Sequence, residues 1–145
     1  MLSGMSMRRC LVFGLLALSC SGGMSTLKTV RPATGEGPIH FEVQNNAGVA
    51  LNNLYMAKTE MVQAADRSHL ERDSTEEVKV WGSDLLDRGA LEEGGRVAIP
   101  VPEAGRWDVR ALDRNDRYQH IAGLKLGAGG RYILEIEDGN WRVIQ

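Results

Sequence analysis

Histidine and serine side chains are the first candidates for chemistry in this 145-residue chain, but their spacing matches no catalytic or metal-binding pattern. His40, His69 and His120 lie far apart, and none stands in a ligand spacing such as H-x-x-x-H. No serine lies in a G-x-S-x-G turn, the pattern that exposes the nucleophile of α/β-hydrolases. We therefore expect a non-enzymatic protein with no catalytic residues, no metal site and no cofactor.

The carboxylates support the same expectation. Adjacent glutamates at 76–77 and at 92–93 stand in polar surroundings, whereas acid–base catalysis needs one carboxyl group in an apolar setting that raises its pKa. Asp113 and Asn115 are spaced like the start of a calcium loop, but the glycine and the distal glutamate of such a loop are missing. A turn between two strands is expected there.

The start of the chain carries the most specific signal. Arg8 and Arg9 precede an apolar run over 10–18, which is the pattern of a secretory signal peptide. The run has about half of the ~20 apolar residues that a membrane-spanning helix needs. Cys20 follows the run after Ser19 and is the only cysteine outside the run, since Cys10 lies within it.

Residues 16–20, Leu-Ala-Leu-Ser-Cys, resemble the lipobox of bacterial lipoproteins, although Ala17 and Leu18 reverse that family's usual order. The resemblance implies that Cys20 becomes the mature N-terminus, with a diacylglycerol on its sulfur and an acyl chain, such as palmitate, on its amine. Two or more acyl chains give stable membrane anchoring. By resemblance to enterobacterial sorting, Ser21 implies the outer membrane, and we expect the domain to face the periplasm. An ordinary cleaved signal, ending near 21–23, is the alternative.

The charge of the mature chain argues against nucleic acid as a partner. Without Arg8 and Arg9, 15 basic residues remain against 19 acidic ones, and no basic stripe is present. With Cys20 as its one cysteine, the exported domain must be stabilised by its own core rather than by a disulfide.

The sequence predicts three segments: a signal peptide over 1–19, a lipidated flexible tether over 20–37, and a β-sandwich domain over 38–145. The tether is rich in Ser, Thr, Gly and Pro and has no periodicity. Alternating apolar residues between Gly, Pro, Asn and Asp turns then predict an all-β antiparallel sandwich of about seven strands. The main strands are expected at 39–44, 51–59, 96–101, 107–112, 118–126, 132–136 and 141–144, with a short strand or strand end at 78–81. A hairpin turn at 138–140 would join the last two.

A polar insertion over 60–79 interrupts this rhythm, and 61–72 could form a short helix. A long solvated loop is one interpretation, and a partner-binding insertion is the other, because long loops in compact domains are often functional. The candidate partner-binding residues are Glu60, Asp66, His69, Glu71, Asp73, Glu76 and Glu77.

A structural motif follows the insertion. Asp84 is expected to accept backbone hydrogen bonds in a tight turn over 82–86, while Leu85 and Leu86 enter the core. Tryptophans are expected to be core or rim anchors rather than a sugar platform. The motif residues are Trp81, Gly82, Asp84, Leu85, Leu86 and Trp107.

The Trp-Gly-x-Asp-Leu-Leu string at 81–86 resembles a group of small exported bacterial domains of unsettled activity. Three further motifs share this resemblance: an Asn-x-x-Gly turn at 45–48, Leu-Tyr at 54–55 and Trp-Asp-x-Arg at 107–110. The Gly-x-Asp-Leu-Leu part is also similar to the outer-membrane lipoprotein of type VI secretion systems. These resemblances imply the fold and an exported, lipid-anchored location more than a function. Because the sequence carries no catalytic pattern, we expect a structural or accessory subunit that binds another envelope protein. The alternatives are the type VI secretion lipoprotein itself and a module that binds a small molecule or glycan.

Overall fold

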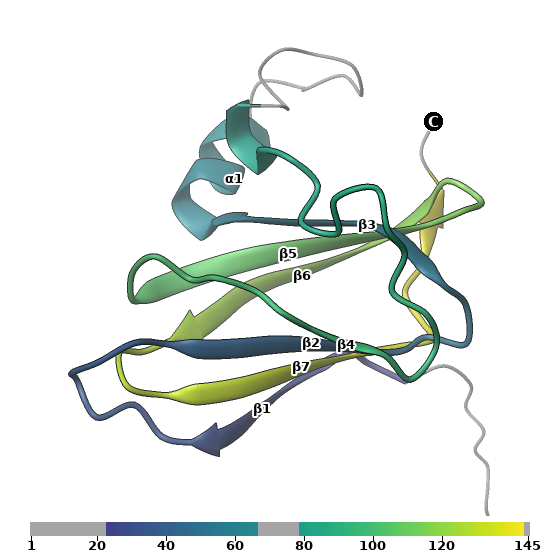
Figure 1. Cartoon of the computed structure of the whole chain (residues 1–145). Helices are drawn as coiled ribbons and strands as arrows, with labels where there is room; N and C mark the ends of the chain where they lie inside the picture. Colours follow the sequence, from purple (N-terminus) through teal and green to yellow (C-terminus); the bar gives the residue numbers. More distant parts are fainter. Residues whose placement is uncertain (1–22, 67–78, 144–145) are drawn as a thin grey trace, which may run out of the picture.

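The computed structural model describes residues 23–66 and 79–143, which form two four-stranded sheets packed face to face (Figure 1). The strands are β1 (Thr26–Arg31), β2 (His40–Asn46), β3 (Leu51–Lys58), β4 (Arg96–Ala98), β5 (Gly105–Asp113), β6 (Arg117–Leu126), β7 (Arg131–Glu137) and β8 (Arg142–Val143). A helix, α1 (Thr59–Asp66), follows β3 directly. The all-β fold predicted from the sequence is confirmed, and so is a short helix in the insertion.

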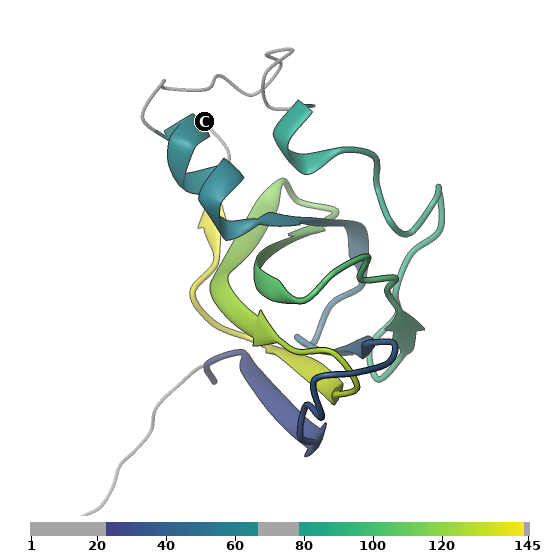
Figure 2. The ribbon, with the colours of Figure 1, turned by 90° about the vertical axis from the view of Figure 1, so that its left-hand side faces the viewer.

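Successive strands pass repeatedly from one sheet to the other. Sheet A has the order β1-β7-β2-β4, and sheet B has the order β3-β5-β6-β8. All pairs are antiparallel except β2 and β7, which run parallel with Phe41 opposite Tyr132. Figure 2 shows the sheets as two layers with α1 on the far side of sheet B. The core therefore depends on contacts between strands that are distant in sequence.

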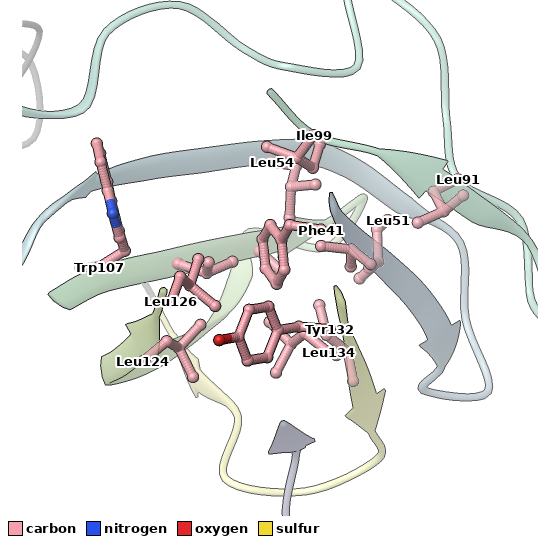
Figure 3. Packing of buried hydrophobic residues seen from close by; sticks show 14 of the residues in the cluster. Phe41, Leu51, Leu54, Leu91, Ile99, Trp107, Leu124, Leu126, Tyr132 and Leu134 are labelled. Atoms are coloured by element: carbon pink, nitrogen blue, oxygen red, sulfur yellow. The ribbon is translucent and has the colours of Figure 1, made fainter. Parts of the chain in front are cut away.

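The core lies between the inward faces of the two sheets. In β2, Phe41 and Val43 are buried while Glu42 and Gln44 are half-buried, which follows from the two-residue period of a strand. Figure 3 shows the rings of Phe41 and Tyr132 next to each other among leucines from both sheets. Each such side chain stabilises the fold by about 1.5–3 kcal/mol when it is fully buried.

A fully buried amide, that of Asn45, organises the turns at one end of the sandwich. Its Nδ2 donates to the carbonyl oxygens of Val49 and Leu91, both at 2.8 Å, and its Oδ1 accepts from the Ala47 N–H at 2.9 Å. The backbone of Asn45 also pairs with Gly94 and Gly95. One side chain thus joins the β2–β3 turn to the loop that precedes β4.

The tether predicted over 20–37 is wrong where β1 lies. Thr26–Arg31 pairs with β7, with Leu27 opposite Leu134 and Thr29 opposite Tyr132. This edge strand has hydrogen bonds along one side only and is almost entirely exposed, so its sequence lacks the alternation that marks a half-buried strand. The domain therefore begins well before residue 38.

Two other predictions near strand ends are also wrong. Residues 79–81 form a helical turn instead of a strand. The turn at 138–140 does not make a hairpin, because β8 pairs with β6 in the other sheet, with Tyr118 opposite Arg142. Trp141 donates from Nε1 to Asp138 at 2.8 Å, and its ring lies 4.8 Å from the Arg117 guanidinium. These contacts direct the chain across the sandwich.

The turn between β5 and β6 is built around the carboxylate of Asp113, whose side chain is inaccessible to solvent. It accepts hydrogen bonds from the N–H groups of Asn115 and Arg117, both at 2.9 Å, and from Arg117 Nε at 2.7 Å. Burial by itself raises the pKa of Asp113, but these hydrogen bonds and the charge of Arg117 outweigh it, so the pKa falls below 3.8. The strand turn expected at this position is confirmed.

We predict that Asp113→Asn destabilises the fold by about 1–3 kcal/mol at neutral pH, because it removes charge-assisted hydrogen bonds. Since the folded pKa lies below the unfolded value of 3.8, the stabilisation is present above that value. It is lost as the pH falls through the folded pKa. Urea unfolding should show a difference between variant and parent that shrinks towards acidic pH.

Asp87 is exposed, and its side chain makes no hydrogen bond among the residues that the structure describes, so it provides the matched control. Asp87→Asn should change the free energy of unfolding by less than about 0.5 kcal/mol. A difference for Asp113→Asn that stays constant with pH would contradict the assigned role of its charge.

Candidate functional site

The most elaborate side-chain arrangement in the described residues lies on the outer face of sheet B, where α1 packs. Val62 of α1 joins Ala57 and Trp81 in a second apolar cluster, separate from the core between the sheets, with Tyr55 and Val80 at its margin. Figure 1 shows α1 above the end of β3, on the side of sheet B that faces away from sheet A. Residues at the start of the insertion and just beyond its end therefore share a small core of their own.

Asp108 of β5 links this layer to the sheet. This residue is 2% exposed, and its Oδ1 accepts from the Thr59 hydroxyl at 2.7 Å and from the Gly123 N–H at 2.9 Å. Its Oδ2 lies 2.7 Å from His120 Nε2. Because an ionised carboxylate only accepts, Nε2 carries the hydrogen in this contact. Four residues from β5, β6 and the start of α1 are thereby held together.

A β-bulge creates this geometry. The pairing of β5 with β6 shifts between Trp107 and Val109, where β6 contains an extra residue. Gly123 occupies the bulge with φ +70°, in the left-handed region that glycine adopts without strain. The bulge shifts the alternation of faces along β6, so that Gln119 and Leu124, at odd and even positions on either side of it, are both buried.

Trp81 is held on the outer face of sheet B by contacts between its ring and the side chains of Arg110 and His120. The Arg110 guanidinium lies 4.7 Å from the centre of the Trp81 ring and 5.0 Å from that of Tyr118. The His120 ring meets Trp81 edge-on, with centroids 5.5 Å apart and an interplanar angle of 80°. A cation–π contact contributes about 0.5–2 kcal/mol, depending on how far it is desolvated. The outer face thus fixes both α1 and the helical turn at 79–81.

Asp108 and His120 form a carboxylate–imidazole pair of the kind that occurs in acid–base catalysis. The Thr59 hydroxyl beside them, however, is not positioned as a nucleophile. Thr59 donates to Asp108 instead of to the imidazole, and His120 uses Nε2 for the same carboxylate. A triad would require the imidazole to lie between the hydroxyl and the carboxylate. This arrangement positions α1 on the sheet.

Within 23–66 and 79–143, no group of three or more His, Cys, Asp or Glu residues could hold a metal ion.

The predicted partner-binding residues are only partly described. Glu60 is exposed in the first turn of α1, and Asp66 is the last residue of that helix. Next to Glu60, Met61 is 46% exposed and is the exposed large apolar side chain of this helix. The other predicted site residues lie outside the described part of the chain: Cys20, His69, Glu71, Asp73, Glu76 and Glu77.

The predicted structural motif is confirmed as a turn against β3. Asp84 accepts from the N–H groups of Leu54, at 2.9 Å, and Leu86, at 3.0 Å. The Leu85 N–H donates to the Leu54 carbonyl at 2.8 Å, so the turn covers part of the β3 edge. Gly82 has φ +73°. Leu85 and Leu86 are half-buried and pack against the main core.

The tryptophans are anchors, as expected. Trp81 and Trp107 are each 7% exposed, and Trp141 packs at the margin of the main core. The Trp107 Nε1 donates to the Glu103 carbonyl at 3.2 Å.

Sequence reasoning missed Thr59, Asp108, His120 and Gly123 as a group. Asp108 stood on the polar face of a predicted strand, and nothing in its neighbours indicated that a helix would cover that face. A glycine inside a strand, as at 123, is the one local signal of a bulge.

An apolar crevice opens between β3 and the end of β4. It is too narrow for a water molecule, and its lining includes Leu54, Met56, Leu85 and Ile99.

No helix in the described residues is long and apolar enough to cross a membrane. No protein-family model, curated protein or solved structure matches the chain.

We predict that Thr59→Val loosens α1, because the valine has nearly the same shape but removes the hydrogen bond to buried Asp108. An eight-residue helix depends on tertiary contacts for its stability. Hydrogen exchange of α1 amides should accelerate by about 5–10-fold, consistent with roughly 1 kcal/mol. The amides of β2 and β7 should change less.

Gln63→Ala provides the control, because Gln63 is an exposed residue of the same helix. It should leave exchange in α1 nearly unchanged. Equal loss of protection throughout both sheets after Thr59→Val would show that the hydroxyl supports the whole fold and not α1 in particular.

Proposed function

We propose that this protein is an exported, lipid-anchored envelope protein, attached through Cys20 to the outer membrane and facing the periplasm. In this proposal it is a structural or accessory subunit without enzymatic activity. It binds another envelope protein through the exposed side of α1. The membrane attachment is supported by the signal pattern and by the resemblance of 16–20 to a lipobox.

The observation that carries the binding proposal is the support beneath α1. Val62 and Thr59 are buried against sheet B, so the helix has a fixed position and its other side faces solvent. Met61 and Glu60 are presented there. A preorganised surface loses little conformational entropy on binding, which favours affinity. Methionine also adapts its shape to an apolar partner surface.

A glycan-binding module is the less favoured interpretation. Sugar binding of that kind uses an accessible aromatic face, whereas Arg110 stacks on Trp81 and the Lys58 ammonium lies 5.9 Å from the Trp107 ring centre. Both indoles are also buried. The exposed apolar side chain of this region belongs to the helix, which suits a protein partner better.

We predict that a photo-crosslinking residue in place of Met61 forms a discrete adduct with one envelope protein in living cells, because Met61 lies at the centre of the proposed contact. Val30 is exposed to a similar degree, 49% against 46%, but lies on β1 in sheet A. The same crosslinker at Val30 is the control and should not give this adduct. Identical adducts from both positions, or none from Met61, would contradict the proposed surface.

We predict that Cys20→Ala moves the protein from the membrane fraction to the soluble fraction, because the acyl chains supply the stable attachment. Cell fractionation and immunoblotting measure the change. Cys10→Ala is the matched control, since Cys10 lies within the apolar run and should leave the attachment intact. Unchanged membrane partitioning of Cys20→Ala would overturn the lipidation proposal.

A further inference from the structure

The position of β1 restricts how the proposed lipid anchor can hold the domain. The side chain of Ser25, just before β1, donates from Oγ to Gln119 Oε1 at 2.9 Å and accepts from the Glu137 N–H at 3.1 Å. Gln119 is 3% exposed and donates to the Glu137 carbonyl at 2.6 Å. The beginning of the folded chain is thereby joined to β6 of sheet B and to the end of β7 in sheet A.

The fixed part of the chain begins close to Cys20. A β-carbon built on Gly23 would lie 3.1 Å from Glu137 Cβ, so Gly23 already packs against the domain. Only Ser21 and Gly22 separate it from Cys20. Whatever conformation those residues take, three residue steps reach at most about 11 Å and the five steps to Ser25 about 18 Å. An anchor at Cys20 therefore leaves the domain little freedom to move away from the bilayer.

The strand register identifies which end of the sandwich lies near this anchor. The start of β1 pairs with the end of β7, where Thr26 is opposite Glu135, and the end of β2 lies beside it, with Asn46 opposite Glu137. We call this the N-terminal end. It comprises the turns at 47–50, 92–95 and 138–141. The first two are connected by the Gly48 N–H, which donates to Glu93 Oε2 at 2.6 Å.

The proposed partner surface lies at the opposite end. Strand β3 starts at the N-terminal end with Leu51 and leads away from it into α1 (Figure 1). Its eight residues span about 26 Å at ~3.3 Å per residue. The anchor and the exposed side of α1 are therefore separated by the length of the sandwich.

We propose that the anchored protein is oriented, with its N-terminal end against the lipid headgroups and α1 directed away from the membrane. This inference rests on the proposed lipidation of Cys20. The turns at this end carry the exposed carboxylates of Glu92, Glu93 and Asp138, and of the basic residues the exposed Arg114 lies in a neighbouring turn, so attraction to anionic headgroups does not hold this end at the membrane. The orientation follows from the short connection to β1, and we expect it to vary little with ionic strength.

Energy transfer from the domain to the bilayer tests this orientation. The mature chain, 20–145, is coupled through the Cys20 thiol to a maleimide lipid in phosphatidylethanolamine–phosphatidylglycerol vesicles that contain an acceptor dye on the headgroups. A donor dye is carried by a noncanonical residue in place of either Glu92, at the N-terminal end, or Gln63, on α1. Both positions are exposed.

We predict markedly stronger transfer from position 92 than from position 63, with little change between low and high salt. As a control, a Gly-Ser segment of about 20 residues is inserted between Gly22 and Gly23. Its r.m.s. length of roughly 25 Å is comparable to the sandwich, so transfer from the two positions should become similar. Equal transfer without the insertion would overturn the proposed orientation.

The chemical coupling makes this test independent of processing in the cell. If Cys20→Ala fails to release the protein from membranes, the lipidation proposal is wrong even when the coupled protein is oriented. If Cys20→Ala releases the protein but transfer is equal from both positions, the orientation alone is wrong.

Discussion

The buried carboxylate of Asp108 is the constraint on which the packing of α1 against the outer face of sheet B depends. A buried charged group is costly unless hydrogen bonds compensate it, and Asp108 receives them from Thr59, Gly123 and His120. Each donor comes from a different local conformation: the first residue of a helix, a β-bulge and a regular strand position. The hydrogen bonds to this one carboxylate therefore fix both the position of α1 on the sheet and the bulge in β6.

The two ends of the sandwich are specialised in different ways. At the N-terminal end, polar side chains such as Asn45, Gln119 and Ser25 connect loops and strands that would otherwise meet only through the backbone. At the other end, Val62 and Trp81 add a second apolar cluster outside the main core. The first arrangement holds the chain close to Cys20, and the second holds a helix with an exposed methionine. A rigid body between the two suits the proposal that the protein presents a surface at a set distance from an attachment at Cys20.

Local patterns predicted most of the central strands. The expected strands at 39–44 and 107–112 correspond closely to β2 and β5, because a half-buried strand alternates apolar and polar residues whatever its partners are. The turn role of Asp84 was also predictable, since a short carboxylate side chain bonds to nearby N–H groups. Edge strand β1 was not, because its residues are exposed on nearly all sides and leave no alternation in the sequence.

The sequence by itself determined the all-β class, the tight turns at 82–86 and 113–116, and the absence of any known catalytic spacing. These properties depend on residues within a few positions of each other. Tertiary structure decided that β8 pairs with β6, that β1 extends the domain towards Cys20, and that Asp108 meets Thr59 and His120. Asp108 and Thr59 are 49 positions apart, and Ser25 and Gln119 are 94 apart. Such contacts arise only when the sheets pack, so no local pattern of residues could encode them.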